Sequence, residues 1–379
     1  MTVQNLRQSS RAVSVLAATA ICGTSMATVL AADEIATDWV EFSYEPYPLA
    51  RISNDVDRYP EATPNSVRVS QHGEIEHLGR AIFGTHWFVD ADQIDGGPVW
   101  HFVTAGDPEN DVVLMVHGYP DTWWANADVM ALLADEYYVI AVDVLGYGQS
   151  DKGPEIDVSY AAAAASLSDL LDTIGVDAFN LIGHDRGSIV SEHLLVQDGM
   201  SERISAFVRM QQSFDQPHGL PRPPHAQMAT VPFQSQPNLA RMVYTSNYGS
   251  VHFPDRYLQR LDWEFGVDGT PEASARTFQG TSFDIELEFR QAHVIPKMTM
   301  PVLLIQGDRD PAQKAEEYMT SADVLPDARV AIVNTNHFIH AEDPHLVADL
   351  ARELFEHGNT NRPDMVFSHP VNFQFPVKD

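Results

Sequence analysis

The sequence predicts an α/β fold, with a mostly parallel β-sheet and helices on both of its faces. Apolar runs of strand length alternate with segments of helical spacing along most of the chain. Some of these runs, such as Val112–Val116, are apolar throughout, as in strands that helices bury on both faces. Strands that alternate with helices build a parallel sheet. The chain has 379 residues, of which 44% are hydrophobic, enough for one large core with an insertion.

The first residues resemble an export signal. Arg7 and Arg11 provide a basic start, and the stretch Val13–Leu30 is mostly small and apolar. Cleavage after Ala31 would leave a mature chain that begins near Ala32. An uncleaved anchor is the alternative, but the stretch is weakly hydrophobic for a spanning helix, which favours cleavage. We therefore expect a periplasmic or extracellular protein.

Composition excludes several kinds of chemistry. The single cysteine, Cys22, lies within the expected signal, so the mature chain has no thiol. A thiol nucleophile, a Cys-ligated metal and an iron–sulfur cluster are therefore excluded. The formal net charge of −30 repels nucleic acid and anionic lipid. We expect a small-molecule substrate, no cofactor, no metal site, no nucleic-acid partner and no stable membrane association, and the sequence leaves the oligomeric state open.

Changes of periodicity divide the chain. Prolines punctuate an irregular segment before the first strand, and periodicity weakens again for about ninety residues after Met210. The predicted organisation is a signal peptide at 1–31, an extended N-terminal arm at 32–82, a first part of the core at 83–212, a cap insertion at 213–296, a second part of the core at 297–357 and a C-terminal tail at 358–379.

The strands and helices are assigned from apolar runs and helical spacing. Strands are expected at Thr85–Val89, Val99–Thr104, Val112–Val116, Tyr138–Val142, Phe179–Ile182, Ile204–Met210, Val302–Gln306 and Ala328–Val333. Helices are expected around Val129–Leu133 and at Ala161–Ile174, Ser188–Gln197, Leu239–Tyr244, Arg256–Phe265 and His345–Phe355.

The segment from Phe179 to Gly187 has the pattern of a nucleophile elbow, in which a strand turns sharply into a helix. Glycines stand two positions before and two positions after Asp185, as a strained backbone turn requires. A carboxylate at this position can attack an electrophilic carbon and form an ester with it. Considered alone, the segment also fits a glycine-rich turn with an exposed aspartate.

Two further residues complete a catalytic set. Asp310 and His337 each follow a predicted strand, and the loops after parallel strands gather at one edge of the sheet. A carboxylate nucleophile needs a base that activates water, and a second carboxylate orients the imidazole. Asp310 alone could cap a helix before Pro311, and His337 could be an ordinary loop histidine among the 16 in the chain. Their order after predicted strands favours the catalytic interpretation.

From residue 84 to 357 the chain resembles the α/β-hydrolase family. The motifs that carry the resemblance are His117-Gly118-Tyr119-Pro120, Asp143 with Gly146-Tyr147-Gly148-Gln149-Ser150, the elbow at Asp185, Gly307 with Asp310, and Asn336-His337. The Gly-His-Asp-Arg-Gly elbow is similar to that of the branch with an aspartate nucleophile, which contains epoxide hydrolases and dehalogenases of haloalkanes and haloalkanoates.

The resemblance implies further roles. It implies that the backbone N–H groups of Tyr119 and Arg186 form an oxyanion hole, and that the insertion is a helical cap. The residues that it offers as substrate-binding candidates are His117, Trp123, His184, Tyr244, Tyr248 and Tyr257. Tyr244 and Tyr248, four residues apart, would share one face of a helix.

Departures from the motifs separate the possible reactions. Haloalkane dehalogenases have Asn and Trp where this chain has Tyr119 and Arg186, and haloacetate dehalogenases have an arginine at the position of Ile189. Epoxide hydrolases use two cap tyrosines as proton donors. The second of them is expected late in the cap, but this chain has no tyrosine between Tyr257 and Tyr318. Epoxide hydrolysis is the leading prediction, haloalkanoate dehalogenation the alternative, and a non-catalytic binding protein a third. A serine esterase is disfavoured because Ser188 lies outside the elbow position.

Overall fold

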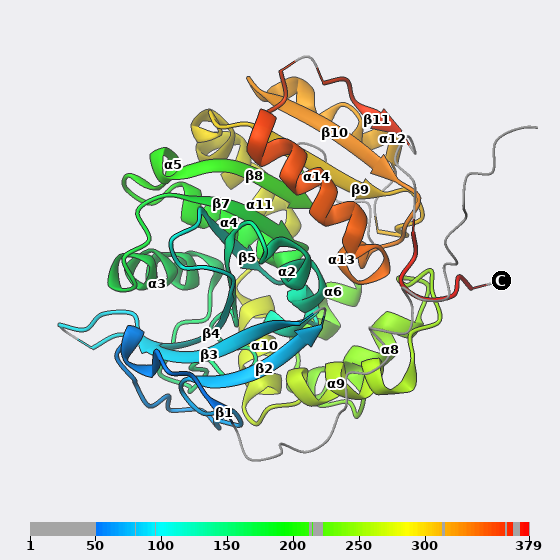
Figure 1. Cartoon of the computed structure of the whole chain (residues 1–379). Coiled ribbons are helices and arrows are strands. Elements are labelled where there is room, and N and C mark those ends of the chain that lie inside the picture. The colour runs from blue at the N-terminus through cyan, green and yellow to red at the C-terminus, as the bar shows by residue number, and fades with distance from the viewer. Residues whose placement is uncertain are drawn as a thin grey trace, which may run out of the picture.

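The computed structural model describes residues 51–378, apart from 80, 95, 212–213, 215–222, 313–314, 361 and 367–371. An 11-stranded sheet forms the centre of this part, in the order β1-β2-β3-β4-β6-β5-β7-β8-β9-β10-β11 (Figure 1). The strands are β1 Arg51–Ile52, β2 Glu74–Gly79, β3 Ile82–Asp90, β4 Val99–Ala105, β5 Val112–Val116, β6 Tyr138–Val142, β7 Phe179–His184, β8 Ile204–Met210, β9 Val302–Gly307, β10 Ala328–Val333 and β11 Met365–Val366.

The sheet has an antiparallel and a parallel part. Strands β1 to β4 pair with their neighbours in antiparallel fashion, as does β4 with β6. The pairs from β6 through β5, β7, β8, β9 and β10 to β11 are parallel. The prediction of a mostly parallel α/β sheet is confirmed.

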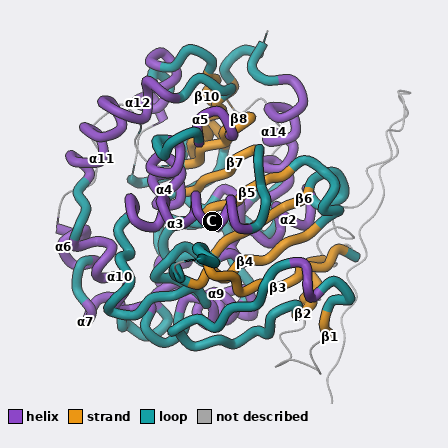
Figure 2. Tube along the Cα trace, turned by 90° about the vertical axis from the view of Figure 1, so that its left-hand side faces the viewer, coloured by secondary structure: helices purple, strands orange, loops and turns teal. Residues whose placement is uncertain are grey.

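Helices cover both faces of the sheet. Helices α2 and α14 pack together on one face, and α3 and α4 pack together on the other (Figure 2). The helices are α2 Ala127–Leu133, α3 Tyr160–Thr173, α4 Arg186–Leu195, α5 Met200–Arg203, α6 Pro223–Met228, α7 Val231–Gln234, α8 Leu239–Thr245, α9 Asp255–Phe265, α10 Thr270–Gln279, α11 Phe283–Phe289, α12 Ala315–Tyr318, α13 Ile339–Glu342 and α14 Pro344–His357. No helix in these described stretches is long and apolar enough to span a membrane.

The segment between β8 and β9 is helical and includes α6 to α11. Its helices α8 and α9 contact each other, and α9 also packs against the turn that follows β5. This insertion therefore lies over the loops at the carboxyl ends of the parallel strands, where ligands bind in open α/β sheets.

The N-terminal segment differs from the expected arm. Strand β2 joins the sheet beside β3, although its sequence is too polar to predict a strand. Its Glu76 accepts a hydrogen bond from Arg260 of α9 at 3.0 Å and contacts His86 of β3 at 3.1 Å. Partners distant in the sequence therefore satisfy its charge. The expected signal peptide at 1–31 lies outside the described residues.

A buried carboxyl at the start of α2 provides a test of stability against pH. Asp128 accepts a hydrogen bond from Gln374 Nε2 at 2.7 Å. Burial raises the pKa of Asp128 to about 6, against the opposing effect of Gln374. The folded state therefore binds more protons than the unfolded state between pH ~4 and ~6, so stability falls as pH rises through this range.

We expect Asp128→Asn to raise the free energy of unfolding by on the order of 2 kcal/mol at pH 7. At pH 4 the change should vanish. Urea unfolding at both pH values checks this, and an equal effect at both would contradict it.

Candidate active site

The elbow places Asp185 at a strained turn between β7 and α4. Asp185 has φ +49°, and α4 begins at the next residue. A Cβ atom on Gly187 would overlap the carbonyl oxygen of Val116, and one on Gly183 would lie 2.9 Å from Ser191 Oγ. Glycine is therefore required on both sides of Asp185, because the turn brings its backbone against β5 and against the first turns of α4.

The structure brings Asp185, His337 and Asp310 together. His337 Nε2 lies 3.5 Å from Asp185 Oδ2, and His337 Nδ1 lies 3.0 Å from Asp310 Oδ2. All three residues are buried. Asp310 Oδ1 also accepts the backbone N–H of Ala312 at 2.7 Å, which holds this carboxylate in place. The imidazole of His337 thus lies between two carboxylates, one on each ring nitrogen.

Charge couples the members of this set. Burial disfavours every charged form here, but Asp310 and Asp185 overcome it and raise the pKa of His337 to about 10. Against the same burial, His337 and Arg186 hold the pKa of Asp185 well below its usual range. At neutral pH Asp185 is therefore a carboxylate and His337 carries a proton. Removing the charge of Asp185, as an ester does, lowers the affinity of His337 for that proton.

Tyr119 supplies one of the two expected oxyanion donors. Its backbone N–H donates to Asp185 Oδ1 at 2.9 Å, which leaves Oδ2 on the side of His337. His117 orients this loop, because its Nε2 accepts the N–H of Val144 at 3.0 Å and its Nδ1–H donates to the carbonyl of Gly118 at 2.8 Å. Arg186 is the first residue of α4, so its N–H lies at the helix N-terminus beside Asp185.

A small, largely apolar cavity is lined by two neighbours of Asp185, Gly118 and Arg186. His117, Leu145, Tyr147, Tyr160, Arg186 and Val190 are among the residues that line it. The Arg186 guanidinium lies over the ring of Phe278, 5.0 Å from its centroid. The cavity offers an apolar wall and a cation, Arg186, next to Asp185 in the chain.

Of the three candidate tyrosines in the insertion between β8 and β9, Tyr248 lies at His337. Its ring meets that of His337 edge to face, with 5.4 Å between centroids. Burial and the charges of Asp310 and Asp185 raise the pKa of Tyr248. The expectation that Tyr244 and Tyr248 share a helical face is wrong, because α8 ends at Thr245 and Tyr248 lies in the following turn.

The other two tyrosines do not face Asp185. The Tyr244 hydroxyl donates to Asp121 Oδ1 at 2.7 Å, and its ring stacks on Phe338 at 3.6 Å. Tyr257 is stacked on Phe253, with 5.2 Å between centroids, in an aromatic cluster of the cap. Both are packing residues rather than substrate ligands.

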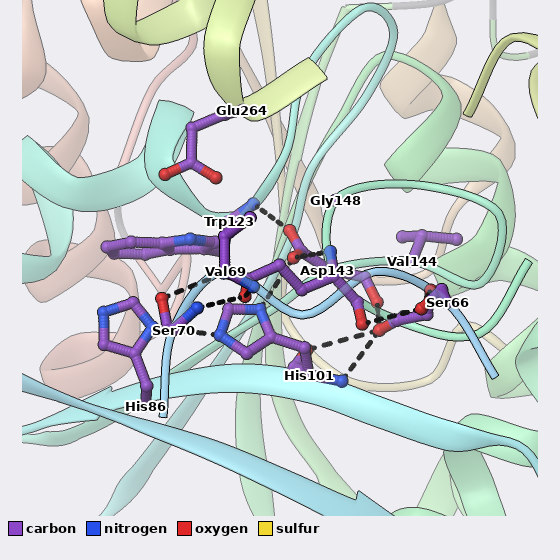
Figure 3. Close-up of polar contacts among 12 residues, drawn as sticks. Ser66, Val69, Ser70, His86, His101, Trp123, Asp143, Val144, Gly148 and Glu264 are labelled. Carbon is purple, nitrogen blue, oxygen red and sulfur yellow. Dashed lines mark hydrogen bonds and ion pairs between the residues drawn. The ribbon is translucent and has the colours of Figure 1, made fainter. Parts of the chain in front are cut away.

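Trp123 is also directed away from the catalytic set. Its backbone N–H donates to Asp143 Oδ1 at 2.8 Å. Its indole meets the ring of His86 edge to face at 5.2 Å, and Figure 3 shows it between His86 and Glu264. His101 Nδ1 contacts Asp143 Oδ2 at 2.7 Å in the same network. This network stabilises the turn after β6 against β3 and β4.

His184 lies behind the catalytic set and not in the cavity. Its Nε2 contacts the backbone carbonyl of His337 at 2.9 Å, so it positions the loop that carries the base. Its Nδ1 lies 3.9 Å from Asp121 Oδ2, and the same oxygen lies 3.7 Å from His340 Nε2. The sequence singled out neither of these two residues, since Asp121 lies in a turn and His340 in the short helix α13, and neither forms a recognisable spacing with other polar residues.

The chain belongs to the alpha/beta hydrolase fold family, whose profile matches residues 111–344. Epoxide hydrolase 4 of Mus musculus is 36% identical over 116 residues, which are 30% of this chain and 32% of that protein. The soluble epoxide hydrolase of Corynebacterium sp. (strain C12) is 25% identical over 277 residues, 67% of this chain and 93% of the relative. A fluoroacetate dehalogenase of Burkholderia sp is 40% identical over 79 residues, 20% of this chain and 26% of the relative.

Solved structures agree on the fold. The epoxide hydrolase CorEH superposes with a TM-score of 0.60 at 22% identity, covering 72% of this chain and 99% of that one. The chain spans about a third of the length of Epoxide hydrolase 4. Family and relatives together support a hydrolase enzyme.

Proposed function

We propose that this protein is an epoxide hydrolase that forms vicinal diols through an ester on Asp185. One observation carries the proposal: the imidazole of His337 lies between the nucleophile and a second carboxylate, at 3.5 Å and 3.0 Å. This geometry suits a base that stays protonated until the nucleophile has reacted. The longer similarities to epoxide hydrolases support the same reaction.

The first step forms the ester. Asp185 Oδ2 attacks one epoxide carbon while Oδ1 stays on the N–H of Tyr119, and the carbon–oxygen bond of the ring breaks. The departing alkoxide needs a proton, and Tyr248 is the cap phenol placed beside the catalytic set. Loss of the Asp185 charge lowers the affinity of His337 for its proton. This proton passes to the phenolate of Tyr248, which restores the phenol and leaves His337 neutral for the second step.

The second step hydrolyses the ester. Neutral His337 takes a proton from water, whose oxygen attacks Cγ of Asp185. The N–H of Tyr119 already lies at Oδ1, where the negative charge of the tetrahedral intermediate develops. The bond between Cγ and the alkyl oxygen breaks, and the diol takes a proton from His337. The new carboxylic acid of Asp185 then gives its own proton to His337, so the Asp185 carboxylate and the protonated imidazole both return.

Tyr248→Phe tests the proton donor. We expect it to slow ester formation on an epoxide by ~10²–10⁴-fold, the range of general acid catalysis, and to leave ester hydrolysis nearly unchanged. Tyr257→Phe is the matched control, because it removes a phenol of the same insertion whose ring stacks on Phe253 and not on His337. Stopped-flow single turnovers separate the two steps. Ester formation at the parental rate in Tyr248→Phe would remove Tyr248 from the reaction.

Haloalkanoate dehalogenation is the second candidate. Arg186 favours it, since a guanidinium beside the nucleophile suits a substrate carboxylate. The similarity to a fluoroacetate dehalogenase covers only 79 residues. A panel of terminal and internal epoxides and of 2-haloalkanoates decides between the two. The proposal predicts diol formation without halide release, and steady halide release with inert epoxides would replace it.

We also propose that the protein is exported, from the pattern of residues 1–31 alone. N-terminal sequencing of the protein secreted by a bacterial host should find a start near Ala32. Retention of Met1 or its neighbour would support an uncleaved segment instead.

A further inference from the structure

A buried cluster of Asp121, His184 and His340 lies behind the catalytic set. Each residue offers one ligand atom, and these atoms all lie within 4.8 Å of one another. Each residue is at most 1% exposed. The cluster joins three segments of the chain: Asp121 lies in the turn that follows Tyr119, His184 ends β7 just before Asp185, and His340 lies in α13 just after His337.

Hydrogen bonding determines which atoms of Asp121 and His184 are available. The contact of His184 Nε2 with the carbonyl of His337 requires a hydrogen on Nε2, so Nδ1 presents a lone pair. Asp121 Oδ1 is occupied by the hydroxyl of Tyr244, and Oδ2 has no hydrogen-bond partner. His184 Nδ1 also has none.

The lone pairs of Asp121 Oδ2 and His184 Nδ1 therefore face each other across the cluster. Asp121 Oδ2 lies 3.9 Å from His184 Nδ1 and 3.7 Å from His340 Nε2. These distances are too long for a direct hydrogen bond, so a proton on Asp121 would reach neither ring. Buried acceptors at such a separation require a species between them that satisfies both.

The donor set and its surroundings match those of a metal site. Imidazole nitrogen and carboxylate oxygen are the ligands that Zn²⁺ and related divalent ions take in proteins. A ligating histidine usually donates its other N–H to a backbone carbonyl, and a ligating carboxylate is itself hydrogen-bonded. His184 with the carbonyl of His337, and Asp121 with Tyr244, already have these outer partners.

We propose that Asp121, His184 and His340 bind one divalent transition-metal ion of the Zn²⁺ class. The ion joins the loops that carry Tyr119, Asp185 and His337, and it neutralises the buried carboxylate of Asp121. Its ligands are closed to solvent, so its role is to hold the loops and not to bind substrate. The site is independent of the reaction proposed above, and its tests need no substrate.

Metal content tests the site directly. The protein is purified without a polyhistidine tag, dialysed against a weak chelator and analysed by inductively coupled plasma mass spectrometry. We expect about one equivalent of a divalent transition metal, or uptake of about one equivalent of added Zn²⁺ with a rise in the thermal midpoint. Failure to retain or take up Zn²⁺, Co²⁺ or Ni²⁺ would overturn the proposal and leave a buried water as the species between the acceptors.

Two variants and a spectrum locate the ion. Asp121→Asn and His340→Gln should each weaken Zn²⁺ uptake by at least ~10-fold. His193→Gln, which removes a histidine that contacts Glu286 outside the cluster, should bind as the parent does. Co²⁺ bound to the parent should show the visible absorption of a low-coordinate site, a readout that stands even if a variant fails to fold. Unchanged uptake in both folded variants, or equal loss in His193→Gln, would contradict this assignment.

Discussion

Asp185→Asn should abolish turnover of epoxides, with kcat lower by at least ~10⁴-fold, because the amide oxygen cannot form the alkyl ester. Asparagine is the suitable replacement, since the residue has φ +49°, a conformation that Asn tolerates better than most other residues. Steady-state diol formation measures the effect.

An equal thermal midpoint in the parent and in Asp185→Asn would show that the loss is chemical and not structural. A folded Asp185→Asn protein that keeps a tenth or more of the parental kcat would rule out covalent attack by this residue.

His337→Gln should allow alkylation of Asp185 and block release of the ester. Water activation requires the imidazole, whereas attack requires only the carboxylate, so we expect ester hydrolysis to slow by ~10²–10⁴-fold. Intact-protein mass spectrometry should then find nearly all of the enzyme alkylated. An epoxide adds its whole mass, whereas a haloalkanoate adds its mass less hydrogen halide, so the same spectrum identifies the chemistry.

The control for His337→Gln is the double variant with Asp185→Asn, which should gain no mass. Turnover of His337→Gln at the parental rate would exclude His337 as the base.

Much of the catalytic set was predictable from the sequence because its signals are local. The glycines around Asp185 reflect a turn that permits no side chain, and this constraint is visible in a few consecutive residues. Asp310 and His337 follow apolar strands, and parallel strands bring such loops to one edge. The structure accordingly places their side chains within hydrogen-bonding reach of one another.

The direction of the cap side chains was not predictable. Tyr244 and Tyr248 have helical spacing, but whether they share a face depends on where α8 ends, and element ends are poorly encoded. The hydroxyl of Tyr244 donates to Asp121, a partner distant in the sequence. Strand β2 was not predicted for a similar reason. Its polar Glu76 is compatible with a strand only because Arg260, distant in the sequence, donates a hydrogen bond to it.

The measurement that tests the covalent mechanism most directly is a single turnover in water enriched in heavy oxygen, with enzyme in excess over epoxide. The water oxygen enters at Cγ of Asp185, and the alkyl oxygen that leaves with the diol comes from Asp185 itself. We expect one heavy oxygen in the peptide that contains Asp185 and none in the diol of the first turnover. Heavy oxygen in the diol, with none in that peptide, would show direct attack by water and contradict the account.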